Sequence, residues 1–349
     1  TESKFGLLKK GFIDNEPEIP SIFVKGLHAS RVNGLLSGLS AFRASIGNTI
    51  FTAIKPATIM VGAKLMGDDA VYKRALYTFG GIGENFKRGF KVLSDEWHLA
   101  NQFPEEAMMR GRADLKLAEE NAFTALNATK EAYRIEGEWG KVGMINMAQA
   151  LSWWPKQKFV RYGTSALYAI DGMTNSFMAS GMARARAYDD LLSKSNGSIV
   201  EEAFQTLQKD LYDNAFDVTG KLTDEAAKFA SQEIALNLDN KVVKALDNLM
   251  DHVPAAKGLF LFPRTGVNMT ELAWSFNPAS SLGPALTRAR KALSAVTEEQ
   301  KLDVLFEHGI DSSQNADLAF RTLKSEYLGR QVAGSSVIMG AGLYAVEGN

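Results

Sequence analysis

The sequence predicts an all-α fold, an elongated assembly of many helices with few or no strands. Helix-forming residues such as alanine and leucine abound, whereas the 349 residues include only 9 prolines. Apolar residues recur mostly at helical spacing, and the alternation typical of β-strands is scarce. With 46% hydrophobic and 23% charged residues, the chain is able to bury a sizeable core.

Charge and cysteine content exclude several classes of protein. A net charge of −1 argues against a protein that coats nucleic acid through charge alone. The chain has no cysteine, which excludes disulfides, thiolate zinc sites and cysteine nucleophiles. A reducing compartment explains this absence, as does a chain that must unfold and refold without covalent cross-links.

The first residues differ in character from the rest. Residues 1–22 are predicted to form an extended arm or linker, because Pro17 and Pro20 favour extended backbone. Residues 23–349 are predicted to form an α-helical domain, with a candidate subdivision near 155–165. No signal peptide is visible. Because the chain starts at Thr1 and ends just after an apolar run, we expect a processed product or part of a longer polypeptide.

Residues 25–64 contain five basic residues and no acidic one. The basic residues are Lys25, Arg31, Arg43, Lys55 and Lys64. The segment is also apolar and rich in glycine and serine, a composition that suits an anionic, partly apolar surface such as a lipid headgroup layer. The alternative is a buried helical hairpin with basic residues at its ends.

Two apolar stretches approach the length of a membrane span. A helix over residues 44–66 would be about 35 Å long, against about 30 Å for the hydrocarbon core. Lys55 at its centre would cost roughly 3 kcal/mol in the bilayer. Residues 332–346 are shorter and contain Gly334 and Gly340, which permit close helix packing. This marginal apolarity favours either core helices or helices that move between water and an apolar environment.

Local signals mark several further helices. Thr223 is predicted to be the N-cap of a helix that continues until Pro254 stops it. Thr297 and Gln300 have the spacing of a capping box, and Gly309 fits the C-terminal end of that helix. The stretch 315–346 is predicted to be amphipathic first and then almost wholly apolar.

Catalytic and cofactor motifs are missing from the sequence. GGIGENFKRG at 80–89 lacks the last glycine of a phosphate-binding loop and is interpreted as a turn between helices. The four histidines have no metal-ligand spacing. Glu136 and Glu138 flank Gly137, and they are interpreted as a solvated turn rather than a catalytic pair. We therefore predict a protein that is not an enzyme and has no cofactor or metal.

A second basic region lies at 257–293, with five basic residues against Glu271 alone. Arg288, Arg290 and Lys291 in it are candidates for contacts with phosphates of DNA or lipid. The alternative is a solvated helix face.

Three stretches together resemble a known family. They are residues 30–63 (SRVNGLLSGLSAFRASIGNTIFTAIKPATIMVGA), 261–278 (LFPRTGVNMTELAWSFNP) and 326–349 (EYLGRQVAGSSVIMGAGLYAVEGN). This ordered set resembles helical regions of the very large internal virion proteins of tailed bacteriophages. In the second stretch the family commonly has a proline where this chain has Gly266.

The resemblance implies a structural virion component. Such a protein is packaged in the capsid and ejected with the genome, and it helps to form a DNA-translocation channel across the host envelope. The implied partners are sister copies or other virion proteins, the portal or tail, host membrane lipid and, without specificity, DNA. Two alternatives remain: an accessory segment of a virion-packaged hydrolase or RNA polymerase, and a capsid-interior scaffold at the portal.

Two sets of residues are predicted to form the contacts. Candidates for binding an anionic surface are Lys25, Arg31, Arg43, Lys55, Lys64, Arg288, Arg290 and Lys291. Candidates for apolar contact with a membrane or partner are Ile50, Phe51, Ile54, Ile59, Met60, Val337, Ile338 and Met339.

Overall fold

The computed structural model describes residues 39–103, 130–153, 158–194, 200–238, 243–246, 263–282, 287–310 and 315–347. In these ranges the chain is helical, and its sole β-type pairing is a single antiparallel bridge between Phe216 and Leu222. The all-α prediction is confirmed. The predicted arm at 1–22 lies outside the described residues.

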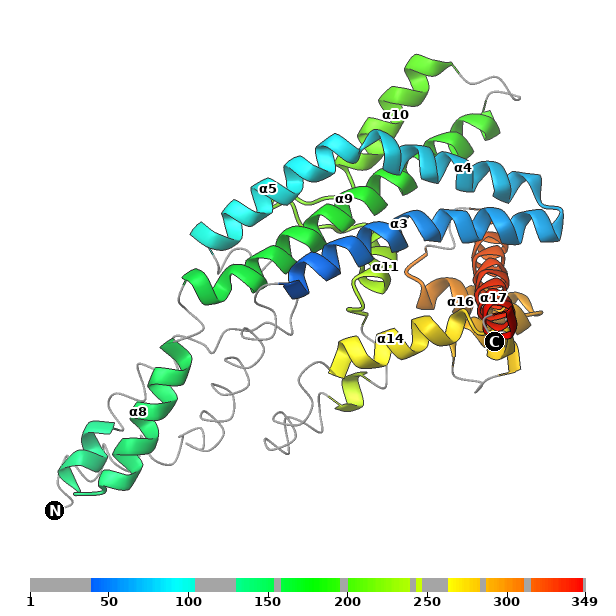
Figure 1. Cartoon of the computed structure of the whole chain (residues 1–349). Helices are drawn as coiled ribbons and strands as arrows, with labels where there is room; N and C mark the ends of the chain where they lie inside the picture. The colour runs from blue at the N-terminus through cyan, green and yellow to red at the C-terminus, as the bar shows by residue number, and fades with distance from the viewer. Residues whose placement is uncertain are drawn as a thin grey trace. The chain divides into compact units, whose positions relative to one another are not determined.

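The main helical elements of the described residues are seen in Figure 1. They are α3 (Leu39–Met66), α4 (Asp69–Glu84), α5 (Phe86–Gln102), α8 (Trp139–Trp153), α9 (Lys158–Lys194), α10 (Glu201–Asp213), α11 (Glu225–Ile234), α14 (Pro263–Ser275), η3 (Pro278–Leu282), α15 (Arg288–Ser294), α16 (Glu298–Glu307) and α17 (Ala316–Glu347).

The chain divides into two compact units that alternate along the sequence. Unit 1 comprises Thr1–Arg43, Trp97–Tyr168 and Asp239–Pro263, and unit 2 comprises Ala44–Glu96, Ala169–Leu238 and Arg264–Asn349. Each unit is therefore assembled from three separate stretches rather than from one continuous half of the sequence.

Unit 1 is held together by aromatic and alanine contacts. The rings of Trp97 and Tyr162 stack at 5.5 Å between centroids. Ala100 and Tyr168 are buried against each other, and Ser165 donates a hydrogen bond to the amide oxygen of Asn101 over 3.3 Å. These contacts pair the end of α5 with the start of α9.

In unit 2, α3 and α4 are antiparallel neighbours joined by a tight turn (Figure 1). Gly67 in this turn has a φ of +67°, which favours glycine, and the Asp68 side chain caps α4 by accepting from the amide of Val71. α4 in turn packs closely on α9, because a Cβ at Gly81 would lie 2.6 Å from the Ser180 carbonyl oxygen.

α17 crosses α3 at a pair of reciprocal glycines. A Cβ at Gly62 would lie 1.8 Å from the carbonyl oxygen of Ser325, and one at Gly329 would lie 1.8 Å from that of Thr58. Only glycine allows the two backbones to approach this closely. The crossing is therefore fixed by both helices at once.

The first half of α17 also forms a core with α15 and α16. Its buried apolar residues are Ala289, Ala292, Ala295, Val304, Leu305, Phe320, Leu323 and Tyr327. The capping box predicted for α16 is confirmed, since the Thr297 hydroxyl and the Gln300 side chain each accept from the other's backbone amide. Gly309 follows with a φ of +66°, as its predicted role at the helix end requires.

The prediction for the region after Thr223 was wrong in two details. Asp224, not Thr223, is the N-cap of α11, and its side chain accepts from the amide of Ala227. The helix ends at Ile234 instead of continuing to Pro254, because Leu236 adopts a φ of +56° that no α-helix accommodates. The apolar periodicity did not reveal this break.

One of the two motifs interpreted as turns is a turn, at residues 136–138. The interpretation of residues 80–89 was wrong, because they are helical except for Asn85. Residues 80–84 end α4, and Asn85 links it to α5. Gly137 has a φ of +75° between Glu136 and Glu138, and both glutamates are exposed. Neither motif forms a phosphate loop or a convergent carboxylate pair.

Candidate functional site

α3 presents an apolar face to the outside. Ile46, Ile50, Val61 and Leu65 are 42–59% exposed. Their spacing of 4, 11 and 4 positions places them on one side of the helix. We call these four residues the α3 stripe.

The buried side of α3 includes four polar residues. Asn48, Thr52, Lys55 and Thr58 are all at most 9% exposed. The hydroxyls of Thr52 and Thr58 donate to the carbonyl oxygens of Asn48 and Lys55, at 2.7 and 2.8 Å. The Asn48 amide lies 3.4 Å from the Thr174 hydroxyl on α9. These four polar side chains are buried together with the apolar Ile59 and Ala63, whereas the α3 stripe is exposed. The polarity of an ordinary surface helix is therefore partly inverted in α3.

α17 has the same inverted character, but along its length. Ser325, Glu326 and Arg330 in its first half are at most 4% exposed. Val337, Ile338 and Met339 in its second half are 57–71% exposed, and Tyr344 is 82% exposed. Three consecutive helical residues point in three directions, so the apolar surface surrounds the helix instead of lying on one side. We call these four exposed residues the α17 apolar segment.

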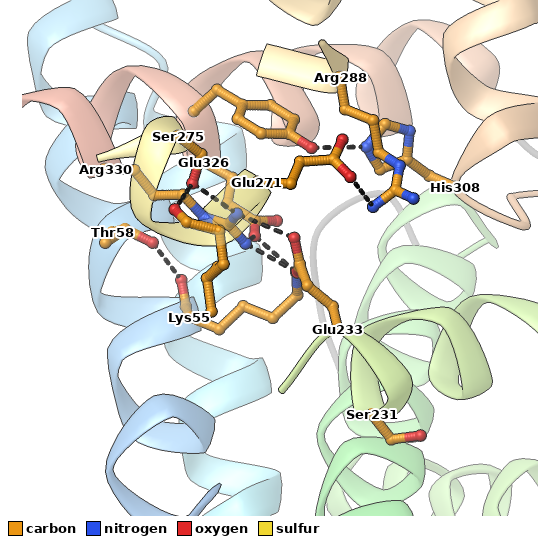
Figure 2. A network of polar contacts seen from close by, with 12 residues as sticks. Lys55, Thr58, Ser231, Glu233, Glu271, Ser275, Arg288, His308, Glu326 and Arg330 are labelled. Carbon is orange, nitrogen blue, oxygen red and sulfur yellow. Dashed lines mark hydrogen bonds and ion pairs between the residues drawn. The ribbon is translucent and has the colours of Figure 1, made fainter. Parts of the chain in front are cut away.

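A buried ion cluster links α3 to α11 and α17 (Figure 2). The Lys55 ammonium lies 2.8 Å from a carboxylate oxygen of Glu233 and 2.5 Å from one of Glu326. The Arg330 guanidinium donates to both carboxylate oxygens of Glu233, at 2.9 and 2.8 Å, and also pairs with Glu326. Two cations thus face two anions, and Arg330 additionally donates to the Ser275 hydroxyl over 3.2 Å.

The charges of this cluster are mutually stabilising. Burial by itself raises the pKa of Glu233, but Arg330 and Lys55 outweigh burial and hold the pKa well below its ordinary value. Burial by itself lowers the pKa of Arg330, but Glu233 and Glu326 outweigh burial and raise this pKa above its ordinary value. Glu233 and Arg330 are therefore charged in the folded protein, and removing one member of the cluster leaves a buried charge without its full set of partners.

A second polar contact lies beside the cluster. His308 is buried, its Nδ1 is 2.6 Å from the Val304 carbonyl oxygen, and its Nε2 is 2.9 Å from the Tyr327 hydroxyl. Nδ1 therefore carries the proton and donates to the carbonyl, so that Nε2 accepts from Tyr327. Burial lowers the pKa of His308 to about 4, which keeps the ring neutral at physiological pH.

The cluster is suited to holding helices together. Its donors and acceptors are directed at one another, and two hollows beside it share the lining residues Glu233, Leu272 and Arg330. Within the described ranges no group of three or more histidine, aspartate or glutamate side chains has the arrangement of a metal site. The candidate functional surfaces are the α3 stripe and the α17 apolar segment, and the cluster positions the helices that carry them.

Three residues predicted to contact an external surface are instead internal. Lys55 was assigned to anionic surfaces, but it is 9% exposed and neutralised by two carboxylates. Arg288 was assigned likewise, but its side chain is 12% exposed, 3.5 Å from Glu271. Ile59 is buried against neighbouring residues of α3 and α4. Lys55 was misassigned because its partners come from distant parts of the sequence. Ile59 was misassigned because the next helix, α4, covers it.

The other predicted basic residues occupy varied positions. Lys64 is exposed at the end of α3, where it lies 3.5 Å from Asp69. Lys291 pairs with Glu307, and Arg290 is partly buried. Arg43 belongs to α3, whereas Lys25 and Arg31 lie outside the described residues.

The predicted apolar contacts divide into an exposed and a packed group. Ile50, Val337, Ile338 and Met339 are exposed. Phe51 packs against Met178, Ala230 and Ile234, and Met60 packs against the α3–α4 core. Ile54 is half-buried and lines one of the hollows beside the ion cluster. Sequence reasoning missed Ile46, Val61 and Leu65, although their common helical face was readable from the sequence.

One helix among the described residues is long and apolar enough to cross a membrane. It covers Ala44–Met66, 23 residues, and 33% of its most apolar part is buried. Length and composition alone support this weakly, because core helices of water-soluble proteins meet the same criteria. Comparisons with protein-family models, curated proteins and solved structures found nothing that matches this chain.

Proposed function

We propose that this chain is a structural component of a tailed-bacteriophage virion. In this proposal it is packaged in the capsid, leaves with the genome and helps to form a DNA-translocation channel across the host envelope. The proposal starts from the resemblance of residues 30–63, 261–278 and 326–349 to internal virion proteins. The first and last of these stretches cover most of α3 and the second half of α17.

The inverted character of α3 and α17 is the observation that carries the proposal. Each helix buries polar side chains beside its apolar core contacts and also exposes large apolar side chains. In water such exposed apolar surface is unfavourable, at about 25 cal/mol per Å² of apolar area. Contact with lipid or with another subunit removes this cost. In this proposal, a protein that is enclosed in the capsid before infection and contacts the host envelope after ejection binds subunits or lipid through such surfaces.

The location of the chain in phage particles is the direct test. We expect mass spectrometry to find it in purified full virions, to find it depleted in particles that have ejected their DNA, and to recover it in the host envelope fraction. A chain that stays in emptied particles would support a scaffold at the portal instead. A chain absent from full virions would refute all three virion interpretations.

The membrane contact is tested separately with liposomes. We expect vesicles containing anionic lipid to retain the purified chain at low salt, since the exposed Lys64 lies at the end of the α3 stripe. Replacing Ile50, Val61 and Leu65 together by serine is expected to reduce retention. The matched control replaces by serine Val200 and Val218, which are exposed outside both surfaces, and is expected to retain wild-type binding. If the wild-type chain is not retained, the membrane contact is disproved.

The enzyme-accessory alternative makes a different prediction. An accessory segment would raise peptidoglycan hydrolysis or transcription when added to the catalytic part of its own protein. We expect the isolated chain to have neither activity. An increase in either activity over that of the catalytic part alone would favour that alternative.

A further inference from the structure

The outer face of α4 and α5 carries a second row of exposed apolar residues, away from α3. Leu76, Phe79, Phe86 and Phe90 are 45–51% exposed. The helical register continues through the junction, because Asn85 donates to the Gly81 carbonyl and accepts from the Gly89 amide. The four residues therefore lie on one face. We call them the α4–α5 strip.

The strip has a basic edge. Lys73, Lys87 and Lys91 are exposed, and at helical spacing they fall beside the strip on the same side. They form no ion pair within the part of the chain that the structure describes. The arginines of the same helices differ, because Arg74 pairs with Asp189 and Arg88 with Asp213. Three positive charges along the strip are therefore available to an acidic partner.

α16 carries a smaller apolar surface with acidic neighbours. Phe306 is 84% exposed and Leu302 is 43% exposed, four positions apart on one face. Glu299 and Asp303 are exposed beside them and have no ion-pair partner among the described residues. Lys301 is turned inward over the ring of Phe320. We call Leu302, Phe306 and these two acids the α16 knob.

We propose that the α16 knob of one copy docks on the α4–α5 strip of a second copy of this chain. Apolar surface then covers apolar surface, while the acids of the knob face the lysines of the strip. Two strips cannot pair with each other, because that contact would place lysines against lysines, and two knobs would likewise oppose acids. An anionic membrane would attract the strip but would repel the knob, and so it accounts for only one of the two surfaces.

The docking has a defined symmetry. The two surfaces lie on different helices of the same unit, so the contact joins unlike patches and is head-to-tail. A head-to-tail contact produces a closed ring where the rotation between copies closes and a filament where it does not. This contact would join the copies of the homo-oligomer that the proposed function includes. Its evidence is the charge and exposure of the two surfaces, and it is tested with the purified chain in solution.

A charge exchange between the two surfaces tests this docking. The strip variant carries Lys87→Glu and Lys91→Glu, and the knob variant carries Glu299→Lys and Asp303→Lys. By sedimentation velocity from about 1 to 100 μM at low salt, we expect the wild-type mass to rise with concentration. Each variant alone is expected to need at least about tenfold higher concentration, because like charges then oppose each other. An equimolar mixture is expected to restore association, since each strip then meets a knob of opposite charge.

A second variant separates docking from folding. Gly83 lies within the strip, and a Cβ there would meet nothing within 4 Å. Gly83→Gln is therefore expected to keep or slightly raise the melting temperature, because glycine is a poor helix former, while its side chain obstructs the strip and weakens association. Lys209→Glu, on the exposed face of α10, is the matched charge control and is expected to associate like the wild type.

Three results would overturn the docking model of the two surfaces. They are a wild-type chain that stays monomeric across the whole concentration range, a mixture that fails to restore association, and a strip variant that loses vesicle retention but keeps self-association. None of them bears on where the chain is found in virions. Conversely, a chain absent from virions would leave the charge exchange intact, so the two proposals fail independently.

Discussion

The two halves of α17 differ in what surrounds them, because the first half buries both polar and apolar side chains and the second half exposes apolar ones. In the first half Glu326 and Arg330 are buried and satisfied by α3, α11 and α14. In the second half Val337, Ile338 and Met339 are exposed. Gly334 marks the change, because a Cβ there would lie 1.8 Å from the Phe276 carbonyl oxygen, whereas one at Gly340 would meet nothing within 4 Å.

The two halves of α17 therefore depend on different kinds of interaction for their stability. The first half is fixed by directional partners that only this fold supplies. The second half offers non-directional apolar surface that any apolar medium or subunit satisfies. The comparison therefore predicts large stability effects for changes before Gly334 and small ones after it, with the functional effects in the reverse order.

Removing the Arg330 guanidinium is expected to have the largest effect on stability. Arg330→Met leaves Glu233 and Glu326 buried with Lys55 as their remaining cation, and breaking such a network costs about 3–5 kcal/mol. Urea unfolding followed by circular dichroism measures this loss. Lys64→Met is the control, because the ion pair of Lys64 is exposed and is worth less than about 1 kcal/mol. Equal losses in the two variants would show that the cluster does not hold the fold.

Acid is expected to weaken the same half of α17 through His308, which contacts Tyr327. Its pKa is about 4 in the folded chain and about 6.5 when unfolded. The unfolded chain therefore binds the proton first as the pH falls. Stability is constant above about pH 6.5, declines as the pH falls toward 4, and loses about 3 kcal/mol in total.

This pH dependence is measured as the urea midpoint between about pH 7 and pH 4.5, where carboxylates with lowered pKa values remain charged. His308→Gln is expected to be less stable at pH 7 but to lack most of the decline over this range. A variant that keeps the full decline would assign it to another group.

The glycine crossing gives the next effect in size. Gly62→Ala forces a methyl group onto the Ser325 carbonyl oxygen and should cost about 2–3 kcal/mol by separating α3 from α17. Gly340→Ala changes the same residue type in the second half, where space is open, and should stabilise the helix by up to about 1 kcal/mol. Thermal unfolding of the two variants compares them directly. A loss at Gly340 as large as that at Gly62 would remove the distinction between the halves.

The sequence predicted the parts of this comparison that depend on near neighbours. The capping box at Thr297, the glycine stop at Gly309 and the change in α17 from amphipathic to apolar all involve residues within a few positions. Such signals are readable because one turn of helix determines them. The all-α fold followed from the same local information.

The sequence did not predict the ion cluster, because its partners are distant. Glu233 and Glu326 lie 178 and 271 positions from Lys55. A lone lysine in an acid-free apolar segment has two explanations, an external anionic surface or acids supplied by other helices. Composition near Lys55 favoured the first, and only the packing of α11 and α17 against α3 shows the second. The close approach of Gly62 and Gly329 was hidden for the same reason.

The smallest expected effect on stability belongs to the α17 apolar segment. Replacing Val337, Ile338 and Met339 together by serine should change the free energy of unfolding by less than about 0.5 kcal/mol per site, because these side chains are already in contact with water. The same variant should bind anionic vesicles less well, because serine forfeits the apolar area that would enter lipid. A stable variant with impaired binding would assign the segment to an external partner. A large loss of stability would instead show that the segment packs against its own chain, and the contrast between the halves of α17 would then disappear.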